Sequence, residues 1–230
     1  MSPIGDNLQA VLRRIEAAAR AAGRDPSEVR LLAVSKTRPA EDDETANRAG
    51  QRAFGESQQQ EPWAKLAALA RLPLEWHFIG PIQSNKTRPI AEQFDWVHSI
   101  EREKIARRLS EQRPSGREPL MACIQVNVSG EASKAGIAPK TALDLAHEVS
   151  GLPNIVLRGL MAIPAPTADF ERQRAQFREL RLLYDALRAQ GFALDTLSMG
   201  MSDDLEAAIA EGSTLVRVGT AIFGARARST

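Results

Sequence analysis

Residues 31–39 read Leu31-Leu32-Ala33-Val34-Ser35-Lys36-Thr37-Arg38-Pro39. An apolar run of strand length ends on a lysine, and the proline that follows stops regular structure. Charged side chains are rarely buried without a partner, so a lysine that closes a core strand has two interpretations. Its amine is either solvated at the rim of the sheet, or held in a sheltered site where it can form a Schiff base with a carbonyl.

Seven further strand-like runs follow residues 31–36, and helical pattern separates each run from the next. These runs cover residues 52–55, 74–79, 94–98, 120–128, 155–161, 196–199 and 214–218. The helical patterns cover residues 8–22, 40–49, 56–72, 85–92, 101–111, 140–149, 170–190 and 203–211. Such alternation predicts a parallel sheet with covering helices.

Eight strand–helix units in 230 residues predict an α/β fold, a single closed (β/α)8 TIM barrel that spans residues 1–230. An open, doubly wound sheet is the alternative. It is disfavoured because no G-x-G-x-x-G fingerprint follows the first strand. No stretch is left over for a second domain.

The composition is that of an ordinary globular protein, with 43% apolar and 26% charged residues. A net charge of +1 provides no excess of positive charge that would attract nucleic acid or an anionic membrane. The single cysteine, Cys123, excludes an internal disulfide, and the three histidines lack zinc-ligand spacing. With no apolar leader and no membrane-spanning run, we expect a cytoplasmic protein.

Several residues whose presence is not explained by packing of the core lie together at one end of the predicted barrel. In such barrels the active face is the carboxyl end of the strands. The unusual residues at those ends are Lys36, Gly55-Glu56, Asn127, Met161, Ser198-Met199-Gly200-Met201-Ser202 and Gly219-Thr220. His77 lies within a strand, between Trp76 and Phe78, which favours a hydrogen-bonded core histidine over a catalytic base. The clustering of the other residues predicts a site at this face.

The loops after the last two strands have the character of a phosphate site. Residues 198–204 supply hydroxyls and a glycine immediately before a helix, and Gly219-Thr220 supply a close backbone approach and another hydroxyl. The alternative for Ser202 and Asp203 is plain helix capping, which needs no ligand. Two such loops at neighbouring strand ends favour a bound phosphate.

Arg217 stands between Val216 and Val218 in a strand that should be buried on both faces. A buried arginine is costly unless it is paired, so it is either half of a structural ion pair or a cation aimed at a ligand in the barrel mouth. An amine, phosphate loops and this arginine together describe one cofactor, pyridoxal 5′-phosphate (PLP). The amine takes the aldehyde, the loops take the phosphate, and the arginine meets the pyridine nitrogen.

At these residues the sequence resembles the pyridoxal phosphate homeostasis proteins (the PROSC-type family) over nearly its whole length. The resemblance rests on seven collinear motifs, at residues 33–36, 54–56, 76–86, 125–127, 159–161, 197–202 and 216–224. It implies a fold-type III barrel related to the cofactor domain of alanine racemases. It also implies PLP as the cofactor, a monomer, and a role in vitamin B6 homeostasis.

The resemblance assigns roles to individual residues. It makes Lys36 the Schiff-base lysine and Arg217 the partner of the pyridine nitrogen. Phosphate contacts are implied for Ser202, Gly219 and Thr220, with Ser198 and Met201 nearby.

Two positions depart from the family pattern. Ser57-Gln58 stand where the family usually has asparagine-tyrosine, and Arg38 replaces a lysine found in some members.

Three functions follow from these observations. The first is a non-catalytic carrier that holds PLP on Lys36, limits the free aldehyde and passes it to apo-enzymes. An arginine at the pyridine nitrogen makes the cofactor a poor electron sink, and no second domain supplies a catalytic tyrosine; Tyr184 falls mid-helix on the barrel exterior. The second is a small amino-acid racemase with Lys36 and His77 or a partner's residue as bases. The third is a cofactor-free, protein-binding barrel.

Overall fold

Eight parallel strands close into a barrel in sequence order, which confirms the predicted (β/α)8 architecture. The computed structural model describes residues 2–57, 62–131 and 134–225. The strands are β1 (Arg30–Val34), β2 (Ala53–Glu56), β3 (Glu75–Phe78), β4 (Trp96–Ile100), β5 (Leu120–Gln125), β6 (Ile155–Met161), β7 (Thr196–Ser198) and β8 (Leu215–Val218). β8 pairs with β1, so the sheet has no open edge.

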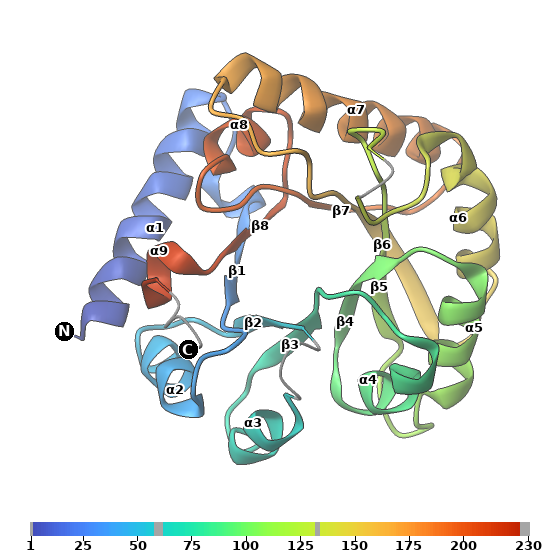
Figure 1. Ribbon diagram of the computed structural model, residues 1–230, viewed down its shortest axis with the longest axis horizontal. Coiled ribbons are helices and arrows are strands. Elements are labelled where there is room, and N and C mark those ends of the chain that lie inside the picture. Colours follow the sequence, from blue (N-terminus) through green and yellow to red (C-terminus); the bar gives the residue numbers. More distant parts are fainter. Residues whose placement is uncertain (1, 58–61, 132–133, 226–230) are drawn as a thin grey trace.

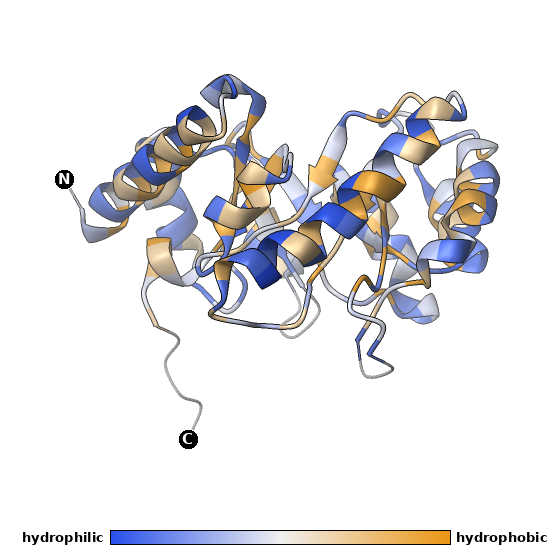
Figure 2. Ribbon diagram, turned by 90° about the horizontal axis from the view of Figure 1, so that it is seen from above, coloured by the Kyte–Doolittle hydropathy of each residue, from blue (hydrophilic) through white to orange (hydrophobic). Residues whose placement is uncertain are grey.

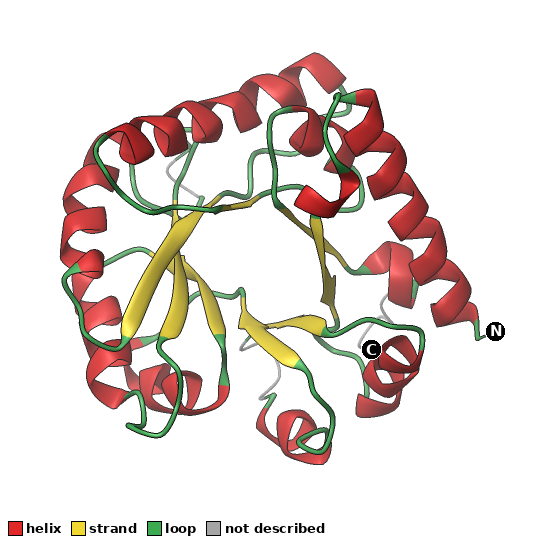
Figure 3. Cartoon of the chain, turned by 180° about the vertical axis from the view of Figure 1, so that it is seen from behind, coloured by secondary structure: helices red, strands yellow, loops and turns green. Residues whose placement is uncertain are grey.

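Helices surround the strands on the outside of the barrel (Figure 1; Figure 3). They are α1 (Pro3–Ala21), α2 (Ala40–Arg48), α3 (Trp63–Ala68), α4 (Thr87–Gln93), α5 (Glu103–Gln112), α6 (Ala142–Ser150), α7 (Phe170–Ala189), α8 (Leu205–Ala210) and α9 (Thr220–Phe223). Hydrophilic and hydrophobic stripes alternate along these helices, as expected when one face packs on the barrel (Figure 2). None of the described helices is long and apolar enough to cross a bilayer.

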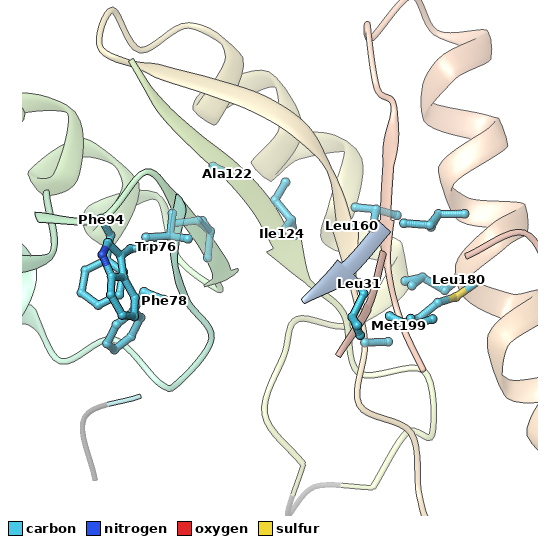
Figure 4. Packing of buried hydrophobic residues seen from close by; sticks show 14 of the residues in the cluster. Leu31, Trp76, Phe78, Phe94, Ala122, Ile124, Leu160, Leu180 and Met199 are labelled. Atoms are coloured by element: carbon cyan, nitrogen blue, oxygen red, sulfur yellow. The ribbon is translucent and has the colours of Figure 1, made fainter. Parts of the chain in front are cut away.

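Most of the core lies between the strands and the helices. Trp76, Phe78 and Phe94 pack together on one side of the barrel (Figure 4), where the rings of Phe78 and Phe94 meet edge to face at 5.3 Å. Gly159 of β6 allows a close approach of β7, because a Cβ at this position would lie 1.7 Å from the Thr196 carbonyl oxygen. The barrel wall therefore depends on a glycine there.

Several predicted boundaries were wrong. The helix predicted over residues 56–72 begins only at Trp63, and Glu56 ends β2, where it pairs with Phe78 of β3; residues 58–61 of that prediction lie outside the described chain. The strand predicted over residues 94–98 is β4, displaced by two residues at each end. The first helix starts at Pro3, because the Ser2 hydroxyl accepts the Gly5 N–H and caps it.

We call the carboxyl ends of the strands, with the loops that follow them, the mouth of the barrel. Lys36, Ser57, Ile79 and Gly219 lie there, each just beyond a strand. We call the opposite end the floor, where the strands begin. The distinction matters because the two ends carry different kinds of polar residues.

Candidate functional site

Lys36 lies two residues beyond β1, half-buried in the barrel mouth. The backbone holds this position firmly: the Ser35 N–H donates to the Gly55 carbonyl oxygen at 3.2 Å. The next residue, Thr37, has a positive φ of 69°, which is unfavourable for a β-branched side chain. Strain of this kind persists only where the surrounding structure enforces it, and it clusters at functional sites.

A pocket of about 220 Å³ opens beside Lys36 at the carboxyl end of β8; we call it the β8 pocket. Six of the seven residues predicted for the site line it: Lys36, Met201, Ser202, Arg217, Gly219 and Thr220. The seventh, Ser198, lies below the pocket in β7 and is fully buried. Residues from opposite ends of the sequence therefore meet around one cavity.

Arg217 supplies the positive charge at the base of the β8 pocket. Its Nη1 donates to the Ser198 carbonyl oxygen at 2.6 Å and to Ser198 Oγ at 2.7 Å, and Nη2 donates to the Ala162 carbonyl oxygen at 2.8 Å. No carboxylate of the described residues contacts the guanidinium directly, so the expected alternative of a direct structural ion pair is not seen; the carboxylate whose charge acts most on Arg217 is that of Asp204, in the loop before α8. Burial lowers the pKa of Arg217 to about 10, at which the side chain is still cationic at neutral pH.

The two loops predicted to hold a phosphate both line the β8 pocket. A Cβ at Gly219 would lie 3.0 Å from the Val34 carbonyl oxygen, so the chain passes unusually close to β1 here. Asp204 is the N-cap residue of α8, but its carboxylate makes no capping hydrogen bond and instead accepts the Met201 N–H at 2.6 Å. Ser202 is therefore not the cap of α8, and it lines the β8 pocket.

Arginines from other elements hold these loops in place. Arg14 of α1 donates to the Ser202 carbonyl oxygen at 3.1 Å while it pairs with Glu206 at 2.8 Å. Arg38, the departure from the family pattern, donates to the Gly224 carbonyl oxygen at 2.5 Å. Both arginines thus fasten backbone that borders the β8 pocket.

A second, larger pocket of about 460 Å³ adjoins the first; we call it the β3 pocket because residues after β3 border it. Lys36 lines both pockets. Ser57 lines the β3 pocket, and its Oγ is buried with no hydrogen-bond partner among the described residues. An unpaired buried hydroxyl is costly, so this one is suited to a ligand. Gln58, the second residue of that departure, lies outside the described residues.

A buried charged cluster behind Lys36 was missed by sequence reasoning. Lys65 of α3 contacts Glu56 at 2.6 Å and Asp43 at 2.9 Å, and it donates to the Ser35 carbonyl oxygen at 2.9 Å. Burial raises the pKa of Asp43 to about 6, although the Lys65 charge opposes the change. This cluster anchors the strand end that carries Lys36. Of the three charged residues in this cluster, the sequence singles out only Glu56, because it lies at the end of a predicted strand.

Three other residues considered from sequence lie away from both pockets. His77 is fully buried within the barrel and bonded to Glu75 and His98, so the expectation of a core histidine is confirmed. The Tyr184 hydroxyl donates to the Leu194 carbonyl oxygen at 3.0 Å in the helix layer. Cys123 is buried, and burial raises the pKa of its thiol to about 12.

The sequence and the fold match a known class. The sequence profile of the alanine racemase N-terminal domain covers residues 7–227. A pyridoxal phosphate homeostasis protein of Pseudomonas aeruginosa is 63% identical over 98% of this chain and 97% of its own. One from Escherichia coli K12 is 52% identical over 98% of each chain. The chain therefore belongs to the pyridoxal phosphate homeostasis proteins, a family within the alanine racemase N-terminal domain class.

Solved structures agree with this assignment. PipY of Synechococcus elongatus, a structure with PLP bound, is 37% identical with a TM-score of 0.82, covering 96% of this chain and 100% of that one. An alanine racemase of Clostridium difficile is 16% identical with a TM-score of 0.73, and the match covers 96% of this chain but 57% of the racemase. The racemase likeness shows the fold alone.

Proposed function

We propose that this protein binds PLP in the β8 pocket, holds it as a Schiff base on Lys36, and serves as a reversible carrier in vitamin B6 homeostasis. The observation that carries the proposal is the meeting of Lys36, Arg217 and the hydroxyl loops around one cavity. The names of the relatives and the PLP-bound PipY structure support the same ligand.

The residues present fit each part of the cofactor. Lys36 offers the amine for the aldehyde, with loss of water. The cationic Arg217, which lacks a carboxylate partner among the described residues, suits the unprotonated pyridine nitrogen. Ser202, Gly219 and Thr220 offer hydroxyls and closely approaching backbone for the phosphate. Met201 borders the same cavity, and Ser198 acts from below by holding Arg217.

A carrier role is supported over catalysis. PLP acts as an electron sink mainly when its pyridine nitrogen is protonated, and an arginine there keeps it unprotonated. No histidine or tyrosine is among the described residues that line either pocket. His77, the second base of the racemase hypothesis, is enclosed in the barrel. The wide β3 pocket beside Lys36 leaves room for an acceptor to approach the bound cofactor during transfer to apo-enzymes.

Equilibrium dialysis against PLP, with the visible spectrum recorded, tests this proposal. We expect one PLP per chain and an imine absorbance band in the wild type. Lys36→Ala should lose the band. Lys104→Ala, which removes an exposed lysine of α5, is the matched control and should bind like the wild type. A wild-type protein that retains no PLP, or a Lys36→Ala variant that keeps the imine band, would overturn the proposal.

A further inference from the structure

A continuous chain of hydrogen bonds runs through the barrel interior from the floor to Arg217. Glu75 Oε1 lies 2.7 Å from His77 Nε2, and His77 Nδ1 lies 2.9 Å from His98 Nε2. His98 Nδ1 lies 2.8 Å from Ser198 Oγ, which accepts from Arg217 Nη1 at 2.7 Å. The links come from β3, β4, β7 and β8, so four strands contribute to one chain.

When both imidazoles are neutral, the chemistry of the two ends fixes the direction of every bond. A guanidinium only donates, so the Ser198 hydroxyl accepts from Arg217 and has its own proton available for His98 Nδ1. His98 then carries its proton on Nε2 and donates to His77 Nδ1. His77 likewise carries its proton on Nε2 and donates to the Glu75 carboxylate, which only accepts. Each neutral imidazole therefore has one donor and one acceptor, both used.

Burial and the neighbouring charges favour this arrangement. Both imidazoles are fully buried, and burial lowers the pKa of His77 and, still more, that of His98, which faces His77 and Arg217. At Glu75, burial alone would raise the pKa, but the hydrogen bond from His77 and the charge of Arg30 lower it to about 2. Glu75 is therefore an anion at neutral pH, while the histidines between it and Arg217 are neutral.

The floor end of the chain is held on more than one side. Arg30 of β1 forms an ion pair with Glu75. The His77 ring stacks on Trp96, with centroids 5.3 Å apart and planes within 9°, and Arg158 covers the Trp96 ring at 5.2 Å. These contacts restrict the rotation of His77 and so preserve the geometry of the next bond.

We propose that Glu75 is a second, remote counter-ion of Arg217, and that His77, His98 and Ser198 are positioning residues that transmit its charge and orient the guanidinium toward the β8 pocket. Hydrogen bonds in series polarise one another, so the carboxylate makes each successive acceptor stronger and finally strengthens Ser198 Oγ as acceptor for Arg217. The buried cation is thus stabilised through neutral groups, with no carboxylate of the described residues in direct contact with the guanidinium. The proposal rests on the PLP function proposed above.

The first test needs no cofactor. Nitrogen-15 NMR of the histidine side chains at neutral pH should find both buried imidazoles neutral and protonated on Nε2. A doubly protonated ring, or a proton on Nδ1 of either ring, would contradict the proposed directions of the hydrogen bonds between Glu75 and Arg217. Because this measurement is made on the protein without PLP, its outcome is independent of the proposed function.

The second test uses PLP binding and the cofactor's spectrum. Loss of a hydrogen bond to a charged group predicts roughly tenfold weaker PLP binding and a shifted absorbance maximum for Ser198→Ala, with recovery in Ser198→Thr, which retains the hydroxyl. Ser110→Ala removes a buried hydroxyl of α5 that bonds Asn154 and should bind like the wild type. If the wild type binds PLP and Ser198→Ala matches Ser110→Ala, the inference is wrong; if the wild type does not bind, the proposed function is wrong.

Substitution of Glu75, the floor end of the hydrogen-bond chain, tests the proposal most sharply. Glu75→Gln keeps an acceptor for His77 but removes the charge, so we expect several-fold weaker PLP binding from a change at the opposite end of the barrel. Glu28→Gln makes the same chemical change at a carboxylate just before β1 that pairs with Arg24 and does not contact the hydrogen-bond chain. It should leave PLP binding unchanged. Equal binding by both variants would contradict a remote counter-ion.

Discussion

The floor and the mouth of the barrel both carry arginines, but they compensate them differently. At the floor, Arg30 pairs with Glu75 and Arg158 pairs with Asp195. At the mouth, the Arg217 guanidinium instead donates hydrogen bonds to carbonyl and hydroxyl oxygens. Charge at the floor is therefore neutralised within the protein, whereas charge at the mouth stays available to an anionic or electron-rich ligand. In barrels of this kind the floor serves stability and the mouth serves function.

Carboxylates near the mouth follow the same division. Asp43 and Glu56 are turned toward Lys65, behind the strand end that carries Lys36. Neither Asp43 nor Glu56 lines the β8 pocket. These two carboxylates thus anchor the strand end that carries Lys36, while Asp203 is the acidic residue among those that line the β8 pocket.

The largest expected effect is the loss of PLP binding when hydroxyls at the mouth of the barrel are removed. Ser202→Ala combined with Thr220→Val removes two proposed phosphate contacts, and hydrogen bonds to a charged group contribute about 1.5–3 kcal/mol each. We expect PLP binding to weaken by roughly 100-fold or more, with the free energy of unfolding changed by less than about 0.5 kcal/mol. Isothermal titration and chemical denaturation measure the two quantities.

The matched floor variant is Thr196→Val, at the start of β7, where the hydroxyl bonds Asp195 and is buried. It should lower the free energy of unfolding by about 1 kcal/mol and leave PLP binding unchanged. The comparison would be contradicted if the mouth variant lost stability while the floor variant, Thr196→Val, lost PLP binding.

The pH dependence of stability should have opposite signs at the two ends. Asp43 has a pKa of about 6 in the folded protein against an ordinary aspartate value of 3.8, so the folded state binds more protons between these values. Its contribution is a stability that falls as pH rises from about 4 to 6, by up to roughly 3 kcal/mol. Glu75, with its pKa lowered to about 2, contributes stability above pH 4.5 that is lost on acidification.

Denaturation of Asp43→Asn and Glu75→Gln across about pH 3–7 separates the two contributions. Relative to the wild type, Asp43→Asn should gain stability as pH rises. Glu75→Gln should be less stable at neutral pH by roughly 1 kcal/mol, a value reduced because Glu75 is about one-third exposed, and the difference should shrink on acidification. Variants whose stability curves run parallel to the wild type would show that neither carboxylate is held as described.

The sequence predicts the barrel well because its strongest signals are periodic. Apolar runs, glycine breaks and polar strand ends locate the eight strands and bring Lys36 and Arg217 to one end. The helix over residues 56–72 was misplaced because its Glu- and Gln-rich start has helical propensity, which pairing with β3 overrides at Glu56.

The buried polar networks could not be predicted in the same way. Asp43 and Lys65 lie in helices that look solvated, and only tertiary packing brings them together. The contact between His77 and His98 depends on the register of β3 against β4, and His98 reaches Ser198 only across the closed barrel. Periodicity locates elements, but it does not specify which side chains meet inside a barrel.

Mapping the lysine that reacts with PLP tests the central claim most directly. The protein would be loaded with PLP, reduced with borohydride and digested, and the phosphopyridoxyl adduct would be located by mass spectrometry. We predict an adduct on Lys36 alone, because Lys36 borders both pockets at the barrel mouth. An adduct confined to another lysine, or none after loading, would contradict the account.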